Sequence, residues 1–150
     1  MPSFSKAFEK CPLVAILRGI EPEEVIEIGV ILTKAGFTLI EIPLNSPEPL
    51  ISIQKLSETF GDKVVIGAGT VLNIDEVGDV AKAGGKMIVS PNTNIDIIIK
   101  TKSLNLISIP GFATATEAFT AVNAGADALK LFPAEGSPPS VLKALSAVLP

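Results

Sequence analysis

The feature that most constrains the fold is a regular alternation along the chain between short apolar runs and helical patterns. The runs are rich in Val and Ile, which favour extended backbone, and each is followed by a segment with helical spacing of apolar residues. The expected strands are Leu13–Arg18, Thr38–Pro43, Lys63–Gly67, Lys86–Ser90, Leu104–Ile109 and Ala126–Phe132. The expected helices are Pro22–Ala35, Pro47–Phe60, Ile74–Ala83, Ile95–Lys102, Thr114–Ala124 and Pro138–Leu149. Successive βα units of this kind predict an α/β protein with a parallel sheet.

Residues typical of helix ends bound these segments. Thr114 and Glu117 have the spacing of a capping box. Prolines suited to the first helical turn are Pro22, Pro47 and Pro138. Glycines expected at helix ends are Gly36, Gly61, Gly84 and Gly125. No linker or low-complexity stretch interrupts this order, so a single domain over residues 1–150 is expected.

Six βα units suggest either an open doubly wound sheet or part of a (β/α)₈ TIM barrel. The segment 67–72 has Leu where a dinucleotide-binding fingerprint needs its third Gly, which does not favour the first option. A barrel predicts functional residues at the carboxyl ends of several strands. Polar residues do fall there, and they are Arg18, Glu41, Thr70, Ser90, Asn92 and Lys130.

The length is short for a barrel. A complete (β/α)₈ barrel needs roughly 200–250 residues, whereas this chain has 150. We therefore expect a barrel domain that is incomplete at its carboxyl end, in a protein that continues past Pro150. The alternative is an unusual incomplete barrel.

Composition excludes several classes of site. The chain has no histidine, which excludes Ser-His and Cys-His nucleophilic sites and histidine-ligated zinc. A net charge of −4 with scattered Lys and Arg argues against a nucleic-acid surface. No apolar run approaches the roughly 18 residues of a membrane span. The single cysteine, Cys11, suits a reducing cytosol, and the first residues do not resemble a signal peptide, so a cytoplasmic location is expected.

One lysine stands among apolar residues in the last expected strand. Lys130 follows Ala-Asp-Ala-Leu and precedes Leu-Phe-Pro. Removing an ammonium from water is costly, so a lysine in a buried strand must be paired or must lose its proton. A neutral amine is a nucleophile toward a carbonyl carbon. Lys130 is therefore a candidate for Schiff-base formation.

Strand alternation predicts which way the charged residues point. Lys130 shares a face with Phe132, and Glu41 shares a face with Leu39, because every second side chain of a strand lies on one side. In both strands the opposite face is the more apolar one, which helices are expected to cover. Lys130 and Glu41 should therefore point into the barrel lumen, with Arg18 at the end of the first strand.

Each of these residues also has an ordinary structural interpretation. Lys130 can extend its ammonium to solvent, with Glu41 as an ion-pair partner. Arg18 can be a solvated loop residue. Thr70 and Pro91 can belong to turns, and Phe132 to the core. Their joint position at strand ends favours the functional interpretation.

The same residues lie in motifs that resemble those of the 2-keto-3-deoxy-6-phosphogluconate/6-phosphogalactonate aldolases. The matching segments are LVAILRG (13–19), GFTLIEIPLNSP (36–47), IGAGTVL (66–72), IVSPN (88–92), PGFATATEAFT (110–120) and GADALKLFP (125–133). They occur in the family's order and span nearly all of the chain. The resemblance implies class I, Schiff-base aldolase chemistry on a (β/α)₈ barrel, usually in a homotrimer, with no cofactor and no metal.

The resemblance also assigns roles to residues. It implies that Lys130 is the Schiff-base lysine and Glu41 the general acid/base. It implies that Arg18 binds the substrate carboxylate. Thr70 and Pro91 match positions that line the pyruvate pocket, and Phe132 matches the aromatic residue packed beside the imine; Asn45, in the loop after the second strand, is also assigned to substrate binding.

The loop after the second strand bears on the substrate. Phosphogluconate-type members tend to read T-L-R-T there, whereas this chain reads PLNSP (43–47), as in phosphogalactonate-type members. The resemblance therefore favours cleavage of 2-dehydro-3-deoxy-6-phosphogalactonate to pyruvate and D-glyceraldehyde 3-phosphate. The family's phosphate-binding turns would lie beyond Pro150. The alternatives are a phosphogluconate-specific or dual-specificity aldolase, another lyase or epimerase, and a non-catalytic sugar-acid-binding barrel fragment.

Overall fold

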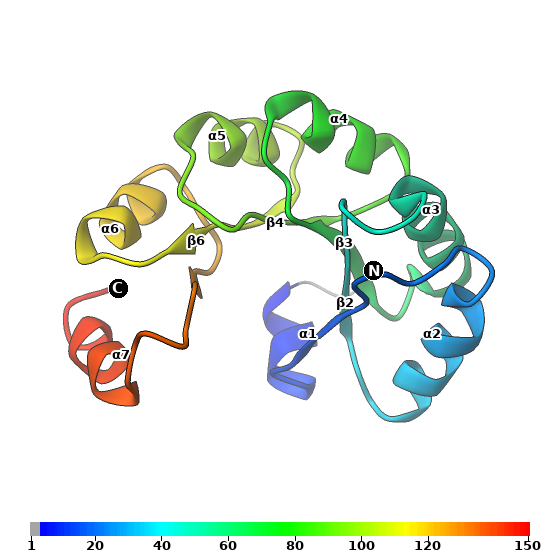
Figure 1. Ribbon diagram of the computed structural model, residues 1–150, viewed down its shortest axis with the longest axis horizontal. Coiled ribbons are helices and arrows are strands. Elements are labelled where there is room, and N and C mark those ends of the chain that lie inside the picture. Colours follow the sequence, from blue (N-terminus) through cyan, green and yellow to red (C-terminus); the bar gives the residue numbers. More distant parts are fainter. Residues whose placement is uncertain (1–3) are drawn as a thin grey trace.

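A parallel sheet of five strands runs through the structure, a computed structural model in which residues 4–150 are described (Figure 1). Its strands are β1 (Val14–Ile16), β2 (Leu39–Pro43), β3 (Val65–Gly69), β4 (Met87–Val89) and β5 (Ile107–Ile109). A second parallel sheet contains β6 (Gly111–Phe112) and β7 (Lys130–Leu131). The helices are α1 (Phe4–Lys10), α2 (Val25–Lys34), α3 (Pro49–Phe60), α4 (Ile74–Lys82), α5 (Ile95–Ser103), α6 (Ala115–Asn123) and α7 (Pro139–Ser146). The prediction of an α/β fold with a parallel sheet is confirmed.

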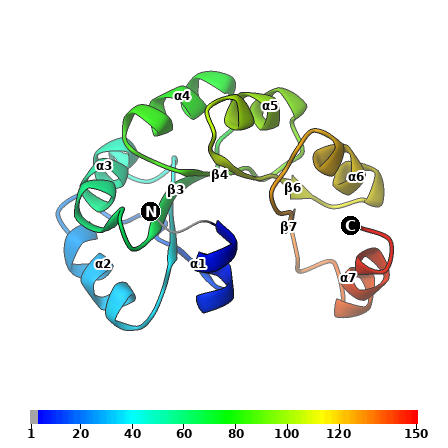
Figure 2. The same ribbon diagram turned by 180° about the vertical axis from the view of Figure 1, so that it is seen from behind.

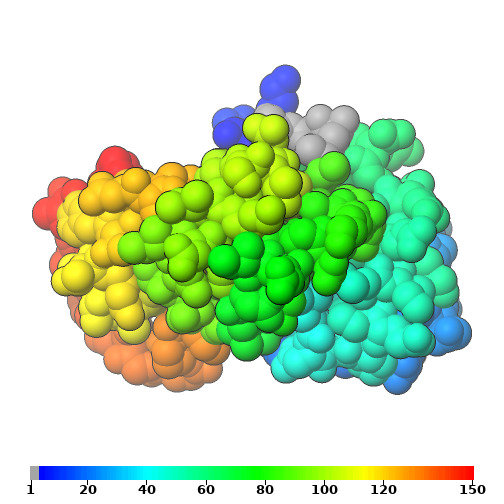
Figure 3. Space-filling model, turned by 90° about the horizontal axis from the view of Figure 1, so that it is seen from above, coloured from blue at the N-terminus to red at the C-terminus, as the bar shows by residue number. Residues whose placement is uncertain are grey.

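The strands are arranged in the order of the sequence. Each strand from β1 to β5 pairs in parallel with the next, and β5 leads through Pro110 into β6, which pairs with β7. A doubly wound sheet would change the direction of strand addition at a switch point, and the described strands show no such change. Helices α2 to α6 lie along the convex side of this curved arrangement (Figures 1 and 2), and Figure 3 shows α3 to α6 as one surface from cyan to yellow.

The two faces of the sheet pack differently. Ile40 and Ile42 of β2 belong to the larger apolar cluster, which includes residues of α2, α3 and α4. Leu39, one position away, belongs to a smaller cluster on the concave face with Val65 and Met87. All of these side chains are buried, and burying each one fully stabilises the fold by roughly 1.5–3 kcal/mol. This alternation confirms that the face opposite Glu41 is the one covered by helices.

Helix α1 was not predicted, and it covers part of the concave face. Ala7 is buried in the smaller cluster, with Phe4 packed against it. The Thr38 hydroxyl donates to the carbonyl of Ala7 at 2.7 Å, which places α1 beside the amino end of β2. Figure 2 shows α1 inside the arc of strands, opposite the outer helices. The helix therefore closes the concave face at the end away from the loops that follow the strands.

Every strand differs from its predicted bounds by at least one residue, and three of these differences have a clear structural cause. The third strand runs through Gly69, because its pairing with β2 continues to Pro43. The fifth strand starts only at Ile107, since Asn105 has a φ of 56° and turns the chain after α5. The last strand is reduced to Lys130–Leu131, because only this part pairs with β6.

Helix ends follow local chemistry more closely. The capping box of Thr114 and Glu117 is present. Gly36, Gly84 and Gly125 have positive φ values at helix ends, whereas Gly61 ends α3 in a right-handed conformation. An equivalent box at Asn73 and Glu76, which begins α4, was not predicted.

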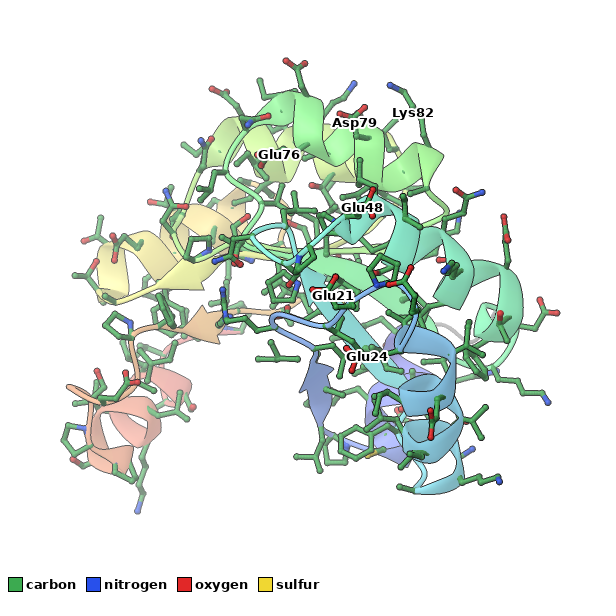
Figure 4. All side chains as sticks on the ribbon, turned by 45° about the vertical axis from the view of Figure 1, so that its right-hand side comes forward. Glu21, Glu24, Glu48, Glu76, Asp79 and Lys82 are labelled. Carbon is green, nitrogen blue, oxygen red and sulfur yellow. The ribbon has the colours of Figure 1, made fainter. Side chains whose placement is uncertain are left out.

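Three helices begin later than predicted, so the prolines expected in their first turns precede them instead. Helix α2 begins at Val25 rather than in the turn at Pro22, and the Glu21 amide donates to the Glu24 carboxylate at 3.1 Å in that turn (Figure 4). Helix α3 begins at Pro49, two residues after Pro47, and helix α7 begins at Pro139, one residue after Pro138.

None of the helices within residues 4–150 combines the length and apolar character needed to cross a bilayer.

An ionic network holds the segment before β7. The Asp127 carboxylate accepts from the Lys102 ammonium at 2.6 Å and from the Ser108 amide at 2.8 Å. The Asp127 amide donates back to the Ser108 carbonyl at 2.9 Å. These contacts join α5, β5 and the start of the last strand segment, and they replace the ladder that a longer β7 would have formed.

Candidate active site

Glu41 lies near the middle of β2, between β1 and β3. It is only 2% exposed, and its neighbours across the two ladders are Ile16 and Gly67. Its side chain points to the concave face, as alternation predicted, because Leu39 on the same side packs in the smaller cluster. A carboxyl in this place is held by strands on both sides.

The surroundings of Glu41 change its acidity. Burial raises the pKa of Glu41 above its ordinary value of 4.5, because the carboxylate is poorly solvated there. The positive charges of Lys130 and Arg18 act in the opposite direction and offset part of this effect. The three charged side chains expected to form a site therefore interact electrostatically in the folded protein.

Lys130 is the first residue of β7. Its amide donates to the Pro110 carbonyl at 2.9 Å, and its backbone is in register with Gly111 of β6. The Lys130 ammonium lies 5.2 Å from the ring centroid of Phe132, within the range of a cation–π contact. The predicted shared face of Lys130 and Phe132 is therefore observed.

The expectation that the strand around Lys130 is buried is wrong for this structure. Residues 126–132 are half-buried or exposed, and Phe132 is 42% exposed. The physical reason is that β7 pairs only with β6 among the described strands, so its other edge has no neighbour. Lys130 is consequently accessible from the concave side.

Glu41 and Lys130 line one cavity of about 300 Å³ on the concave face. Most of its wall is apolar, and the remaining lining residues are Phe4, Phe8, Val14, Ile16, Val89, Ile109, Ala128 and Leu129. The two residues are separated by almost 90 positions in the sequence, and the fold brings them to the same space. A low-polarity wall strengthens the electrostatic interactions of groups within such a cavity.

Arg18 lies beside this cavity, in the loop that follows β1. Its guanidinium donates from Nη1 to Oδ1 of Asn45 at 2.5 Å. Next to this contact, the Gly19 amide donates to the Ser46 hydroxyl at 3.0 Å. Two hydrogen bonds thus join the loops after β1 and β2, and Asn45 contacts Arg18 directly. Arg18 remains exposed, with guanidinium hydrogens available to a ligand.

Thr70 and Pro91 follow β3 and β4, but neither lines the cavity of Glu41 and Lys130. Thr70 has a φ of 57°, which is unusual and strained for a β-branched residue. Pro91 lies against Gly111, where an added Cβ would be 2.3 Å from the Pro91 carbonyl oxygen. The structure therefore places both residues at strand ends, as predicted, with Pro91 beside the Gly111 that pairs with Lys130.

Sequence reasoning did not identify Gly69 or the aromatic residues of α1 as parts of this region. Phe4 and Phe8 line the cavity and lie 5.8 Å apart between ring centroids. Their four-residue spacing was a usable signal for a helix with one apolar face. Gly69 lies against the Glu41 carboxyl, and its position in a GAG run carried no such signal.

Comparison with known proteins gives a consistent match. The family described as KDPG and KHG aldolase matches residues 5–150. The chain is 49% identical over 142 residues to the 2-dehydro-3-deoxy-6-phosphogalactonate aldolase of Escherichia coli, covering 94% of this chain and 69% of that protein. A solved native KDPGal structure superposes with a TM-score of 0.92 at 48% identity, covering 94% of this chain and 68% of the other.

A more distant solved structure is also similar. It is the KDPG aldolase of Legionella pneumophila with pyruvate captured at low pH as a covalent carbinolamine intermediate. The TM-score is 0.86 at 29% identity, covering 95% of this chain and 69% of that chain. The present chain thus spans about two thirds of the length of each of these proteins.

Proposed function

The chain belongs to the KDPG and KHG aldolase family, and from this we propose that it is a class I aldolase with Lys130 as its Schiff-base residue. The proposed reaction cleaves 2-dehydro-3-deoxy-6-phosphogalactonate to pyruvate and D-glyceraldehyde 3-phosphate. The observation that carries the proposal is the convergence of Lys130 and Glu41 on one cavity of about 300 Å³. The Lys130 amine can form an imine there, and the Glu41 carboxyl, whose pKa is raised, can transfer the protons that imine chemistry needs.

The proposed reaction begins with the Lys130 amine. Its Nζ attacks the C2 ketone to give a carbinolamine, and loss of water gives a protonated imine. The C3–C4 bond then breaks, with its electron pair moving toward the imine nitrogen while the C4 hydroxyl loses its proton. This releases the aldehyde and leaves an enamine. Protonation at C3 and hydrolysis then release pyruvate and restore Lys130.

Glu41 is the proposed proton donor and acceptor. Because burial raises the pKa of Glu41, its carboxyl keeps a proton to higher pH than an ordinary glutamate. Such a group can donate a proton when the carbinolamine loses water and accept the C4 hydroxyl proton afterwards, directly or through water. Phe132, 5.2 Å from the Lys130 nitrogen, faces the position where the imine charge would form.

Arg18 is the proposed ligand of the substrate carboxylate, because a guanidinium matches a planar carboxylate with two parallel hydrogen bonds. Its contact with Asn45 orients it from the neighbouring loop. Thr70 and Pro91 are proposed to line the pyruvate side of the pocket, which rests on their motifs and their places at the ends of β3 and β4.

The choice of substrate rests on relatives and on one loop. A relative at 49% identity acts on the phosphogalactonate derivative according to its name. The loop that contains Asn45 reads PLNSP (43–47), which resembles the phosphogalactonate-type members. A phosphogluconate-specific or dual-specificity enzyme is the alternative, because relatives of that kind match at lower identity. Turnover of both C4 epimers separates these possibilities.

We also propose that the domain forms part of a (β/α)₈ barrel. The sequential strand order and the outer layer of helices support this arrangement. Assembly into a homotrimer is proposed as well. Ile95 and Ile99, one helical turn apart on α5, and Phe119 on the adjoining α6 are exposed and would suit an interface. The cytoplasmic location expected from the cysteine content stays a prediction.

The direct test is borohydride reduction of the whole protein in the presence of pyruvate, followed by peptide mass mapping. The expected result is a covalent adduct on the peptide that contains Lys130, and no adduct on the same peptide of Lys130→Met. Binding of the sugar acid without any reducible adduct would contradict the aldolase and favour a non-catalytic sugar-acid-binding barrel.

A further inference from the structure

The concave face of β3 lacks side chains at two positions near Glu41. The positions that face this side are Val65, Gly67 and Gly69, whereas the side chains of Ile66 and Ala68 point to the helices. Two glycines therefore stand where two side chains would otherwise project toward the site. Gly67 and Gly69 have no positive φ, so the backbone conformation does not require glycine at either position.

The two glycines make room for different neighbours. A Cβ built on Gly67 would lie 2.2 Å from the carbonyl oxygen of Met87 and 2.6 Å from its Cβ, so Gly67 permits close approach of the backbone of β4. A Cβ built on Gly69 would instead meet the carboxyl of Glu41, at 2.6 Å from Oε1, 2.8 Å from Cδ and 3.1 Å from Oε2. All three of the nearest atoms belong to that one functional group.

We propose that Gly69 is a positioning residue, whose missing side chain lets the Glu41 carboxyl lie against β3 in the cavity that it shares with Lys130. The catalytic part of this inference rests on the proposed aldolase function. Glu41 is only 2% exposed but lines the cavity that it shares with Lys130, so its flexible side chain can move away from β3 toward that cavity. A methyl group at position 69 thus forces the carboxyl away from the strand, and a displacement of about 1 Å can cost about 100-fold in rate.

The first test is Gly69→Ala in the whole protein. We expect kcat to fall by about 100-fold. The KM of the sugar acid should stay near the parent value, because the substitution does not touch Arg18, the proposed ligand of the substrate carboxylate. A crystal structure of the variant should show the Glu41 carboxyl displaced from β3. Unchanged kcat, or a carboxyl in its original position, would overturn the proposal.

The matched control is Gly78→Ala on α4, where an added Cβ meets nothing within 4 Å. This variant should keep the parent kcat, and alanine should favour the helix slightly. A similar loss of kcat in Gly78→Ala and Gly69→Ala would mean that any added methyl perturbs the protein, and the specific role of Gly69 would be lost.

A stability cycle separates this inference from the aldolase proposal. Gly69→Ala is made in the parent and in Glu41→Ala, which has no carboxyl to displace, and the melting temperature of each is measured. The destabilisation by Gly69→Ala should disappear in the Glu41→Ala background, since the two effects act through one contact. An equal loss in both backgrounds would assign the clash to other atoms and overturn the positioning role.

The two proposals fail in different measurements. If borohydride traps no pyruvate on Lys130 in the parent, the aldolase proposal fails and Gly69 loses its catalytic role. The stability cycle still decides whether Gly69 holds the place of the carboxyl. If Gly69→Ala does not fold alone but folds with Glu41→Ala, the contact with the carboxyl is supported; failure of both variants to fold would overturn it.

Discussion

Glu41 and Lys130 line the same cavity but are held by very different amounts of structure. Glu41 lies on a strand with neighbours on both sides, in which every residue from Leu39 to Pro43 is buried. Lys130 lies on a two-residue strand with one neighbour, and α7, which follows it, has no buried residue. The backbone of Glu41 is therefore held by strands on both sides, whereas that of Lys130 is held by its pairing with β6 alone.

This difference shows where rigidity and access lie in the site. A buried carboxyl needs a well-defined position, because small displacements alter both its pKa and its distance from the substrate. A lysine that attacks a substrate needs access and can move through its four-carbon side chain. The burial of Glu41 suits its proposed role in proton transfer, and the accessibility of Lys130 suits its proposed role as the nucleophile.

The largest expected effect is on the accessible half. Lys130→Met keeps the apolar stem and removes the amine, so we expect activity to fall by at least about 10⁴-fold, as for other covalent nucleophiles. Steady-state kinetics with the sugar acid measure this loss. Lys143→Met, on the exposed surface of α7, is the matched control and should keep parent activity. Substantial turnover by Lys130→Met would remove the proposed nucleophile.

The attachment of the last strand segment can be weakened without changing Lys130. Asp127→Ala removes the ion pair with Lys102 and the acceptor of the Ser108 amide, at an expected cost of about 1–3 kcal/mol. Hydrogen exchange should increase at β6 and β7 and change little at β2 and β3. Asp79→Ala, which breaks the exposed pair with Lys82 on α4 (Figure 4), is the control and should have little effect. Equal increases over both sheets would contradict the contrast between the two regions.

The buried half should respond to pH. Since burial raises the pKa of Glu41 in the folded state, the folded protein binds more protons than the unfolded chain above about pH 4.5. The contribution of Glu41 to stability is therefore fully present at low pH and is lost as the pH rises through its folded pKa. The charges of Lys130 and Arg18 offset part of this loss.

Glu41→Gln tests this response. The variant cannot ionise at that position, so it does not lose stability there as the pH rises. The melting temperature of the variant minus that of the parent should therefore increase from pH 4 toward pH 8, and thermal denaturation over that range measures this difference. Glu117→Gln is an informative comparison, because hydrogen bonds from Ala113 and Thr114 lower the pKa of Glu117. The contribution of Glu117 to stability is therefore lost as the pH falls, the opposite of the pH dependence expected for Glu41. A constant difference between Glu41→Gln and the parent at all pH values would contradict the raised pKa.

The smallest expected effect concerns the amino end of α6, a helix that contributes no residue to the lining of the cavity. Thr114→Ala removes the hydroxyl that caps α6 and should cost about 1 kcal/mol, because the Glu117 amide loses its acceptor. Thr114→Ser keeps the hydroxyl and should behave like the parent in chemical denaturation. Thr114→Ala should keep the catalytic activity of the parent, and a loss of activity would mean that the amino end of α6 affects the site.

Much of the fold could be predicted because its signals are local. The alternation of Val- and Ile-rich runs with helical spacing predicted the order of strands and the outer helices. The period of two along β2 correctly assigned Glu41 to the concave face, since Ile40 and Ile42 pack on the other side. Caps such as Thr114 were predicted because their partners lie within four residues.

Other parts of the site depend on contacts between distant segments. The sequence showed two phenylalanines in residues 4–10 but not that α1 covers the concave face. It predicted a buried strand around Lys130, and the structure shows a half-exposed one, because burial depends on which strands lie beside it. The contact of Asn45 with Arg18 joins residues 27 positions apart, and that of Gly69 with Glu41 joins residues 28 positions apart.

The sequence by itself determined the types of element, their order, the face on which each strand presents its polar residue, and the family. Only the tertiary structure decided that Lys130 and Glu41 line one cavity, that Glu41 is buried while Lys130 is half-buried, and that Gly69 leaves the space for the carboxyl. The physical reason is range. Backbone propensity and side-chain periodicity act over a few residues, whereas burial, pKa and steric room are set by atoms from segments far apart in the chain.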